Sequence, residues 1–314
     1  MSSYLVTGGA GFIGSHIVDR LVEQDEDVRV LDNFVTGKIE NIQHNLGKIE
    51  LVRGSLVDLE TVRQAVKGVD HVLHQGAIPS VPRSVSDPIA SNEANITGTL
   101  NVLVAARDAG VKRVVYASSS SVYGDIPTLP LVEDMPTNPL SPYALTKLTG
   151  EYYCRMFYTL YGLEAVILRY FNVFGPRQDP ASQYSAVIPK FLSLMLEDRQ
   201  PVINGDGLQS RDFTYVENNV SANLLACAKP NVAGEVLNIA CGERFTLLDL
   251  VDSLNRIMGK EIEPLFGPSQ PGDVKHSLAG IEKAEALLEF KPTVGFHEGL
   301  ERTAAWSAGG QADR

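Results

Sequence analysis

The sequence predicts an α/β fold, a doubly wound parallel sheet with a smaller C-terminal α/β domain. Three observations predict it. Short apolar runs of strand length alternate with longer stretches of helical periodicity in the first part of the chain, as a parallel sheet with crossover helices requires. A glycine-rich turn joins the first apolar run to the first helix. After Phe171 the elements become shorter and are interrupted by prolines and an Asn-Gly-Asp-Gly turn, which indicates a second domain.

The N-terminal segment has the order strand, glycine turn, helix and strand. The apolar run Tyr4–Val6 precedes Thr7–Gly14, and after a helical stretch the run Val28–Leu31 ends in Asp32. This order is typical of Rossmann-like units, which place a pyrophosphate at a helix N-terminus. The sequence therefore predicts a dinucleotide site in this part of the chain.

Each glycine of the turn has an expected task. Gly8 permits the tight turn, Gly11 lets the backbone approach the phosphates, and Gly14 lets the helix pack close to the strand. Their three-residue spacing differs from the commonest dinucleotide fingerprint, in which a single residue separates the first two glycines. The flanking strands and the acidic residue that follows the second strand still support the assignment.

Asp32 indicates which dinucleotide binds. Its carboxylate would accept hydrogen bonds from the adenosine ribose hydroxyls and repel a 2′-phosphate, and no arginine follows in Asn33-Phe34. We therefore expect NAD rather than NADP. Asp58 has two open interpretations: it binds the adenine amino group, or it caps the helix expected at Leu59–Val66.

The remaining elements complete the sheet and divide the chain. We expect strands at Val69–Leu73, Val111–Ala117, Ala165–Leu168 and Val236–Ile239, and helices at Asn95–Ala109 and Tyr143–Leu160. Residues 1–172 are assigned to the NAD-binding Rossmann domain, to which 213–240 are expected to return. Residues 173–212 and 241–308 are assigned to the substrate domain, and 309–314 to a frayed tail.

Composition and charge limit the partners and the compartment. The 314-residue chain has a formal net charge of −11, which argues against nucleic acid as a partner. The first apolar run is too short for a signal peptide, and none reaches the ~20 residues of a membrane helix. The three cysteines lack metal or disulfide spacing, so we expect no metal and a cytoplasmic protein.

The segment Ser141–Lys147 contains the candidate chemistry. Tyr143 and Lys147 are four residues apart and therefore share one face of a helix. A phenol has an unperturbed pKa of about 10, and a neighbouring ammonium lowers it by favouring the phenolate. We expect Tyr143 to act as a base with Lys147 as its activator. The polar run Ser118–Ser121 lies upstream, where a strand is expected to end.

Several motifs follow one another along nearly the whole chain: Thr7–Gly14, Asp32-Asn33, Ser118–Gly124, Tyr143–Lys147, Arg169–Gly175, Ser185–Phe191, Asn204–Asp206 and Arg211–Phe213. Together they resemble an extended short-chain dehydrogenase/reductase of the UDP-hexose 4-epimerase family. The resemblance is closest to the UDP-N-acetylglucosamine 4-epimerase branch. It implies tightly bound NAD, a UDP-sugar substrate, and a homodimer formed through the helices at 95–109 and 143–160.

The resemblance also implies a mechanism. Tyr143 would remove the proton of the sugar 4-hydroxyl while C4 gives its hydride to NAD, and Ser119 would relay that proton. Lys147 would hold the nicotinamide ribose. The 4-keto sugar would then turn over and take the hydride back on its other face. Nucleotide-sugar dehydratases carry an Asp-Glu pair where this chain has Ser120-Ser121, so dehydration is disfavoured.

The resemblance assigns two sets of binding residues. The expected cofactor-binding residues are Gly8, Gly11, Phe12, Ile13, Asp32, Asn33, Phe34, Thr36, Gly37, Asp58, Leu59, Gln75, Gly76, Ala77, Asn95, Ser118, Tyr143, Lys147 and Tyr170. The expected substrate-binding residues are Ser80, Ser119, Ser120, Tyr143, Asn172, Gln178, Ala186, Val187, Ile188, Val202, Asn204, Arg211, Asp273 and Ser277. A guanidinium at Arg211 suits a pyrophosphate because it can pair with two phosphate oxygens at once.

The residue at position 277 is expected to select the sugar. In the family a bulky aromatic there restricts the pocket to plain hexoses, whereas the small Ser277 admits an N-acetyl group. The first hypothesis is interconversion of UDP-GlcNAc and UDP-GalNAc, with UDP-glucose and UDP-galactose also accepted. Two departures bear on it: Pro79 stands where glycine is usual, and Gln270 stands where a second phosphate-binding arginine is usual.

Other functions stay open at this stage. A UDP-glucose 4-epimerase restricted to plain hexoses and a UDP-uronic acid 4-epimerase are alternatives, with Arg83 as a carboxylate partner or a salt-bridge residue. A net NAD-dependent dehydrogenase would need exchangeable cofactor. A non-catalytic NAD-sensing protein on the same fold belongs to a different class, and it is disfavoured because Tyr143, Lys147 and Ser119 are all present.

Overall fold

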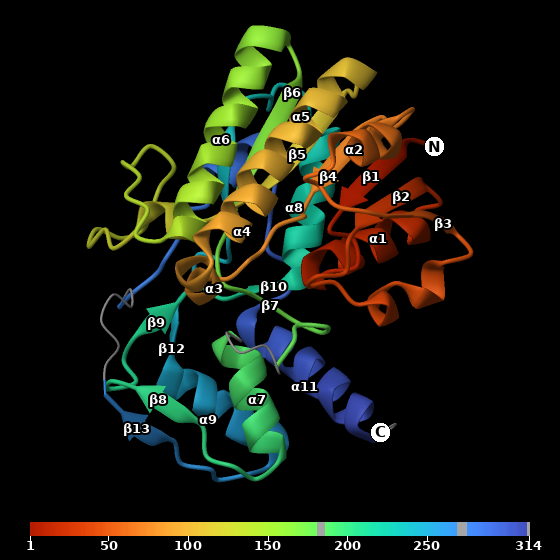
Figure 1. Ribbon diagram of the computed structural model, residues 1–314. Coiled ribbons are helices and arrows are strands. Elements are labelled where there is room, and N and C mark those ends of the chain that lie inside the picture. Colours follow the sequence, from red (N-terminus) through yellow and green to blue (C-terminus); the bar gives the residue numbers. More distant parts are fainter. Residues whose placement is uncertain (181–185, 269–274, 313–314) are drawn as a thin grey trace.

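A seven-stranded parallel sheet forms the centre of the molecule (Figure 1). The computed structural model describes residues 1–180, 186–268 and 275–312. The sheet has the strand order β11-β6-β5-β4-β1-β2-β3, as a doubly wound fold requires. Its strands are β1 (Ser3–Thr7), β2 (Asp27–Asp32), β3 (Ile49–Arg53), β4 (His71–His74), β5 (Arg113–Ser119), β6 (Glu164–Tyr170) and β11 (Val236–Ile239). The predicted fold class is confirmed.

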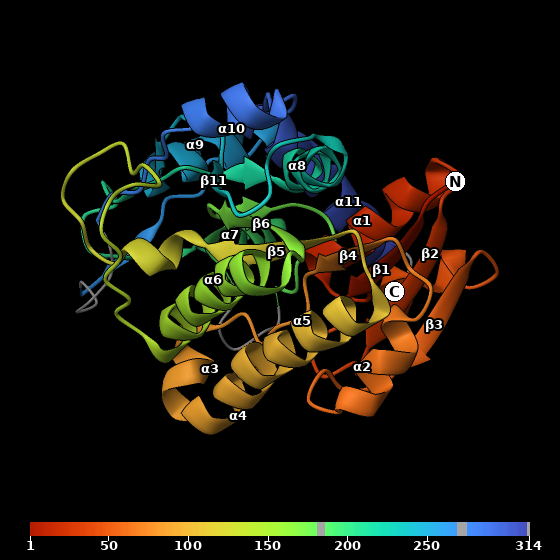
Figure 2. The ribbon, with the colours of Figure 1, turned by 90° about the horizontal axis from the view of Figure 1, so that it is seen from above.

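Helices cover both faces of the sheet (Figure 2). One buried apolar cluster joins the sheet to α1 (Phe12–Glu23), α8 (Val216–Ala228) and α10 (Glu282–Leu288). A second cluster joins the opposite face to α2 (Leu59–Val66), α5 (Gly98–Ala109) and α6 (Pro142–Tyr161). Because both faces are buried, the strands consist of almost continuous apolar residues rather than an alternating pattern.

Short elements connect β4 to α5 and β5 to α6. They are α3 (Val81–Ser86), α4 (Pro88–Asn92), a π-helical turn (Glu93–Thr97) and a 3₁₀ turn (Ser120–Tyr123), and two further 3₁₀ turns (Ile39–Asn41 and Gln43–Asn45) precede β3. None of these was expected as a separate element. The helical periodicity that begins at Asn95 includes the π-turn, since a π-turn and an α-helix share nearly the same apolar pattern.

Helix α6 is fixed at both ends and lies unusually close to the sheet. The Ser141 hydroxyl accepts a hydrogen bond from the Ala144 amide (3.1 Å), and Pro142 occupies the first helical turn. The helix ends at Gly162, which adopts a left-handed conformation. At Gly150 a Cβ atom would collide with the Tyr116 ring of β5. Only glycine permits this approach.

The smaller part of the molecule packs around its own aromatic core, below the sheet in Figure 1. Phe245 stacks on Phe296 with ring centroids 4.1 Å apart, and Phe174 and Phe213 pack nearby. Its helices are α7 (Val187–Leu196), α9 (Leu247–Met258) and α11 (Phe296–Ala312). Its strand pairs are β7 (Val173–Phe174) with β10 (Thr214–Tyr215), β8 (Val202–Asn204) with β13 (Leu265–Gly267), and β9 (Ser210–Arg211) with β12 (Phe245–Thr246).

Two predicted boundaries differ from the structure. Helix α10 lies within residues 241–308, which the prediction assigned to the smaller domain, yet Ala284 and Leu288 are buried in the core on the sheet. A short amphipathic helix does not show by its pattern which core it will join. Helix α11 continues to Ala312, where a frayed tail was expected from residue 309. Glycines weaken a helix but need not end one. No helix in the described ranges is long and apolar enough to cross a membrane.

Candidate active site

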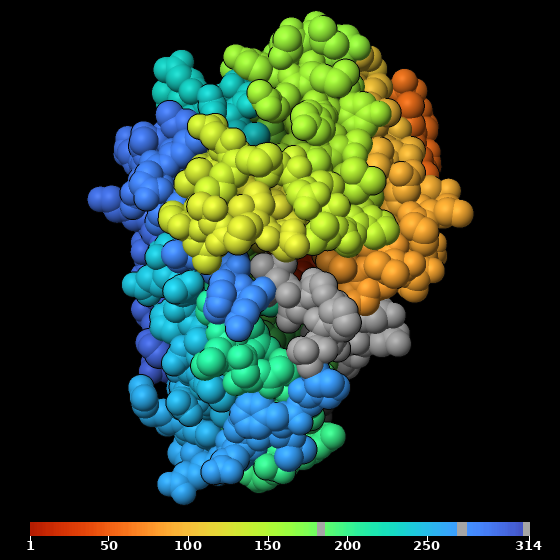
Figure 3. Space-filling view, turned by 90° about the vertical axis from the view of Figure 1, so that its left-hand side faces the viewer, coloured from red at the N-terminus to blue at the C-terminus, as the bar shows by residue number. Residues whose placement is uncertain are grey.

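A cavity of about 1360 Å³ lies where the carboxyl ends of the sheet strands meet the smaller part of the molecule, the usual ligand position in doubly wound folds. Figure 3 views the molecule from the side on which the two parts meet, with the first part (yellow and green) above the smaller part (teal and blue). The glycine turn after β1, the end of β5, the start of α6 and segments of the smaller part all line the cavity.

The structure brings Ser119, Tyr143 and Lys147 together on one wall of this cavity. Ser119 is the last residue of β5, and its hydroxyl makes a hydrogen bond with the Tyr143 side chain. The Lys147 ammonium donates to the Ala117 carbonyl at 2.7 Å. The Tyr143 amide donates to the Ser84 hydroxyl at 3.0 Å, which ties the start of α6 to α3.

Burial dominates the ionisation of the pair. Burial raises the pKa of Tyr143, and the hydrogen bond from Ser119 lowers it in part. Burial also lowers the pKa of Lys147 to about 8, and the nearby Cys154 acts in the opposite direction by raising that pKa. The expectation that Lys147 lowers the phenol pKa is therefore wrong for the protein alone: Ser119 provides the lowering influence, and desolvation outweighs it.

The glycine turn is built for a phosphate group. A Cβ atom at Gly8, where φ is +66°, would meet the Gly76 backbone at 2.7 Å. A Cβ at Gly14 would collide with the Gly8 carbonyl. Gly11 is the N-cap of α1 and has no capping side chain, so the first amides of the helix are left to the cavity. Unsatisfied amides at a helix N-terminus bind anions. These residues fit the pyrophosphate of NAD.

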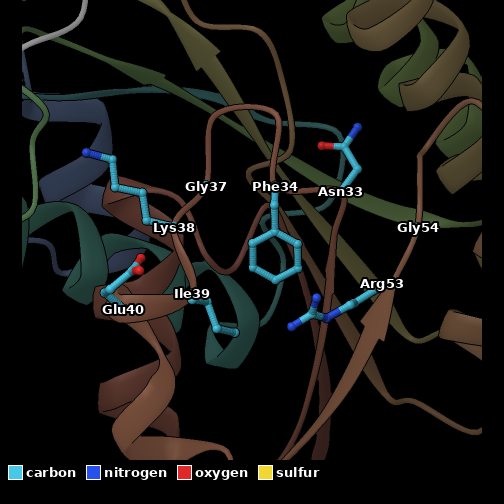
Figure 4. Close-up of a pocket in the computed structure, with 8 residues that line it drawn as sticks. All are labelled: Asn33, Phe34, Gly37, Lys38, Ile39, Glu40, Arg53 and Gly54. Atoms are coloured by element: carbon cyan, nitrogen blue, oxygen red, sulfur yellow. The ribbon is translucent and has the colours of Figure 1, made fainter.

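Asp32 fixes the backbone beside the glycine turn at one end of the cavity. Its carboxylate accepts hydrogen bonds from the Ala10 amide (3.0 Å) and the Phe34 amide (2.8 Å). Burial raises the pKa of Asp32, and these bonds act against that change. A cavity of about 650 Å³ adjoins this end. Figure 4 shows the Phe34 ring and the Arg53 guanidinium in it, and the guanidinium lies 5.0 Å from the ring centroid.

Asp58 is a helix cap in this structure. Its carboxylate accepts hydrogen bonds from the Glu60 amide (3.0 Å) and the Thr61 hydroxyl (2.6 Å). Of the two interpretations of Asp58, the structure shows the capping one. The residues that line the cavity here are Ser55, Leu56 and Val57. Leu59 belongs to the capped helix, and it is not among the lining residues.

Asn95 lies buried behind the residues that line the cavity and supports them through hydrogen bonds. It is buried in the π-turn, and its side chain bonds both backbone groups of Ile78 and donates to the Thr146 hydroxyl at 3.0 Å. It therefore ties the exit of β4 to α6. The prediction placed Asn95 among the cofactor contacts, but it does not line the cavity.

Most of the other predicted site residues line the same cavity. From the cofactor set they are Gly8, Gly11, Phe12, Ile13, Asp32, Asn33, Phe34, Thr36, Gly37, Gln75, Gly76, Ala77, Ser118, Tyr143, Lys147 and Tyr170. From the substrate set they are Ser80, Ser119, Ser120, Tyr143, Asn172, Gln178, Ala186, Arg211 and Ser277. Four predicted substrate residues are not among the lining residues: Val187, Ile188, Val202 and Asn204. Asp273 and Gln270 lie outside the described residues.

Sequence reasoning missed several cavity residues. Arg53 lies opposite Asp32 in the β2–β3 register, which no sequence motif indicates. Lys38 forms an ion pair with Asp179 (3.2 Å), and Arg177 with Asp19 (2.6 Å), so both cations link the 176–179 segment to the N-terminal unit. The two ion pairs join residues more than a hundred positions apart, and only the folded chain reveals them.

Comparisons with known proteins agree with this geometry. A model of the "NAD dependent epimerase/dehydratase family" matches residues 4–240. The chain is 41% identical over 304 residues to a putative UDP-glucose 4-epimerase of Methanocaldococcus jannaschii, covering 96% of this chain and 97% of the relative.

Two solved structures are similar along nearly their whole length. One is a UDP-N-acetylglucosamine 4-epimerase from Methanobrevibacter ruminantium in complex with UDP-N-acetylmuramic acid, with TM-score 0.94, 41% identity and coverage of 98% and 99% of the two chains. The other is a UDP-glucuronic acid 4-epimerase from Bacillus cereus in complex with UDP-glucuronic acid and NAD, with TM-score 0.91, 35% identity and the same coverage.

Proposed function

We propose that this chain, which belongs to the NAD dependent epimerase/dehydratase family, is a UDP-sugar 4-epimerase with tightly bound NAD. One observation carries the proposal: Ser119, Tyr143 and Lys147 share a cavity with a glycine turn suited to a dinucleotide. Relatives named as UDP-glucose 4-epimerases over nearly the whole chain support it.

The residues that would hold NAD lie along one side of the cavity. Gly11, Phe12 and Ile13, at the start of α1, would hold the pyrophosphate, and Asp32 would hold the adenosine ribose. Lys147 would hold the nicotinamide ribose. When bound, NAD would supply the hydride acceptor for oxidation at the sugar C4 and the hydride donor for reduction of the keto sugar.

Two side chains that line the cavity, Tyr143 and Ser119, would transfer the proton. Tyr143 takes the proton of the 4-hydroxyl as C4 is oxidised, and Ser119, hydrogen-bonded to Tyr143, shares it. The same groups return the proton after the keto sugar has turned, so no net oxidation occurs. The positive charge of bound NAD would favour the phenolate and oppose the effect of burial on the Tyr143 pKa.

The proposed substrates are UDP-GlcNAc and UDP-GalNAc, with UDP-glucose and UDP-galactose also accepted. Ser277 and Ala186, two small residues, line the cavity and leave space for an acetamide. The Ser277 amide donates to the Ser210 carbonyl at 3.0 Å, which fixes this wall to β9. Pro79 also lines the cavity and would narrow it. An enzyme restricted to UDP-glucose and UDP-galactose is the alternative that follows from that narrowing.

A specific observation favours a second candidate, a UDP-uronic acid 4-epimerase. Arg83 lines the cavity from α3. Among the described residues, none forms an ion pair or a side-chain hydrogen bond with the Arg83 guanidinium. These residues therefore do not support the interpretation of Arg83 as a salt-bridge residue. An unpaired guanidinium in a cavity suits a carboxylate ligand. A solved UDP-glucuronic acid 4-epimerase is 35% identical to this chain.

The experiment that separates these functions is incubation of the purified protein with UDP-GlcNAc, UDP-glucose and UDP-glucuronate, without added NAD, followed by proton NMR. A C4-inverted product supports the epimerase, and its identity selects the sugar. Inversion without added NAD supports tight cofactor binding. Bound NAD with no inversion of any substrate would support the NAD-sensing alternative instead.

We also propose a cytoplasmic homodimer. Helix α6 exposes Leu145, Tyr152 and Met156 to solvent, each about half exposed, and exposed apolar groups on one helix suit a helix–helix interface. The three cysteines are free, as in a reducing compartment.

A further inference from the structure

Helix α6 carries a third ionisable residue in the same register as Tyr143 and Lys147. Glu151 lies four positions after Lys147, so the three side chains share one face. That face packs against the end of β5, which supplies one partner to each. Tyr143 bonds the Ser119 hydroxyl, Lys147 bonds the Ala117 carbonyl, and Glu151 bonds the Ser118 hydroxyl. The proposed reaction assigns no task to Glu151.

Glu151 forms a buried ion pair with Arg169 of β6. The Arg169 Nε atom lies 2.9 Å from Glu151 Oε1, and Nη2 lies 2.8 Å from Oε2. Only 5% of the Arg169 side chain and 4% of the Glu151 side chain are exposed. Tyr123 packs on the guanidinium, with its ring centroid 4.6 Å away. Two-point contact at this depth holds the carboxylate in one orientation.

Ser118 also binds Glu151, and this contact replaces the cofactor contact that was predicted for its hydroxyl. Its hydroxyl donates to Glu151 Oε1 inside the protein, although the residue lines the cavity. The prediction counted Ser118 as a cofactor contact, and its hydroxyl is already engaged here. Ser118 lies opposite Arg169 in the β5–β6 register, so the serine and the arginine approach the same carboxylate from adjacent strands.

Without Arg169, Glu151 would have a different counterion within reach. Lys147 precedes it by one helical turn, and a buried carboxylate that loses its partner seeks another cation. The other titratable groups around Lys147 are Tyr116 from β5, His74 from β4, and Tyr143 and Cys154 from α6. All of them are neutral near neutral pH: burial raises the pKa values of both tyrosines and of Cys154, so they keep their protons, and burial lowers the pKa of His74, so its ring is not protonated.

We propose that Arg169 is a positioning residue for the reaction. It binds both oxygens of Glu151, keeps that buried anion away from Lys147, and so leaves the Lys147 ammonium unpaired for the cavity. The inference rests on the proposed function, because it assumes that Lys147 and Tyr143 act together on substrate and cofactor. It predicts that loss of Arg169 changes the ionisation of the catalytic pair, beyond any effect on folding.

The test compares Arg169→Gln with Arg113→Gln. Arg113, a buried residue of β5, forms an ion pair with Glu164 of β6 at 2.6 Å, at the opposite end of these two strands, and the Glu164 side chain is 44% exposed. The two variants therefore disturb the same strand pair, and only one of them frees a carboxylate beside Lys147. The first readout is the pH profile of kcat with UDP-glucose. The second is the phenolate absorbance of Tyr143, taken as the difference from the Tyr143→Phe form of each variant.

Wild type should lose activity as the pH rises through about 8, where Lys147 loses its proton. In Arg169→Gln the freed Glu151 carboxylate should favour the protonated form of Lys147. The alkaline limb of the kcat profile should therefore move up by about one pH unit. The value of kcat should fall about tenfold, with KM little changed. The Tyr143 titration should also move to higher pH. The double variant Glu151→Gln/Arg169→Gln should return the alkaline limb of kcat and the Tyr143 titration to their wild-type pH values. Arg113→Gln should leave both at those values.

The proposal would be overturned if Arg169→Gln left both the alkaline limb of kcat and the Tyr143 titration at their wild-type pH values. An equal shift in Arg113→Gln would do the same, since it would indicate general loosening. If Arg169→Gln does not fold, Arg169→Lys takes its place: a lysine keeps the charge but not the two-point contact, and a smaller shift in the same direction is required. If wild type inverts no UDP-sugar, the proposed function fails, and the phenolate titration still decides this inference.

Discussion

At the scale of single residues, the ionisation of the proposed catalytic pair depends on its surroundings more than on its spacing. Tyr143 and Lys147 are four apart on a helix, yet burial raises the pKa of one and lowers that of the other. The protein alone therefore does not stabilise the phenolate. Ser119 supplies a hydrogen bond, and bound cofactor must supply the rest. Local spacing predicted which residues meet, and burial decides how they ionise.

Removal of the Tyr143 hydroxyl tests its role as the base. We expect Tyr143→Phe to lower kcat by about two to four orders of magnitude, because the other hydrogen-bond partner of Ser119 among the described residues is Ser121, whose hydroxyl is a poor base. UDP binding, measured by calorimetry, should survive. Tyr161→Phe at the exposed end of the same helix, outside the residues assigned to the dimer face, is the matched control and should be neutral. Near-normal turnover in Tyr143→Phe would remove Tyr143 from the mechanism.

Position 277 should control the sugar. Ser277 lines the cavity and is only 7% exposed, so a tyrosine there would fill space next to the substrate. We expect Ser277→Tyr to reduce kcat/KM for UDP-GlcNAc by at least tenfold, and to reduce that for UDP-glucose much less. Separate assays with the two sugars measure this. Equal losses on both would show that position 277 does not select the sugar.

At the scale of elements, the sequence predicted well where local patterns carry the information. Strands expected at Val111–Ala117 and Ala165–Leu168 appear as Arg113–Ser119 and Glu164–Tyr170. Apolar runs mark buried residues, whereas strand pairing extends into the polar residues at the site, which explains the shift in β5. The glycine turn was also predictable, because its positive φ and close contacts demand glycine.

Gly150 tests how closely α6 must approach the sheet. We expect Gly150→Ala to destabilise the protein by about 1–3 kcal/mol, because the added methyl group would collide with Tyr116 and push the catalytic helix outward. Gly309→Ala on α11 is the matched control. It meets nothing within 4 Å and should be neutral or stabilising. Urea unfolding of both variants measures this, and equal effects would contradict the close-packing account.

At the scale of the whole molecule, the parts that the sequence did not predict are the long-range ones. Helix α10 joins the sheet core although it follows the smaller domain in sequence. Arg53 lies opposite Asp32 through strand register, and Arg177 reaches α1 through an ion pair. Asp58 had two plausible tasks, and the position of α2 relative to the cavity decides between them. None of these contacts leaves a periodic signal in the chain.

The proposed dimer can be tested on the exposed face of α6. We expect Met156→Glu to convert a dimer into a monomer, because a charge would be buried between two apolar helix faces. Phe266→Glu is the matched control, since Phe266 is also an exposed apolar residue but lies on β13 in the smaller part of the molecule. Light scattering measures the mass of each. A monomeric wild-type protein, or equal effects of the two changes, would contradict the proposed interface.

The proposed reaction is a reversible oxidation at C4 of a UDP-sugar by a cofactor that stays bound. The most direct test uses UDP-glucose with deuterium at C4, in ordinary water and without added NAD. Because the hydride removed from C4 is the one returned, the C4-inverted product should retain its deuterium in full, as proton NMR and mass spectrometry would show. Inverted product that has exchanged this deuterium for solvent hydrogen would contradict the account.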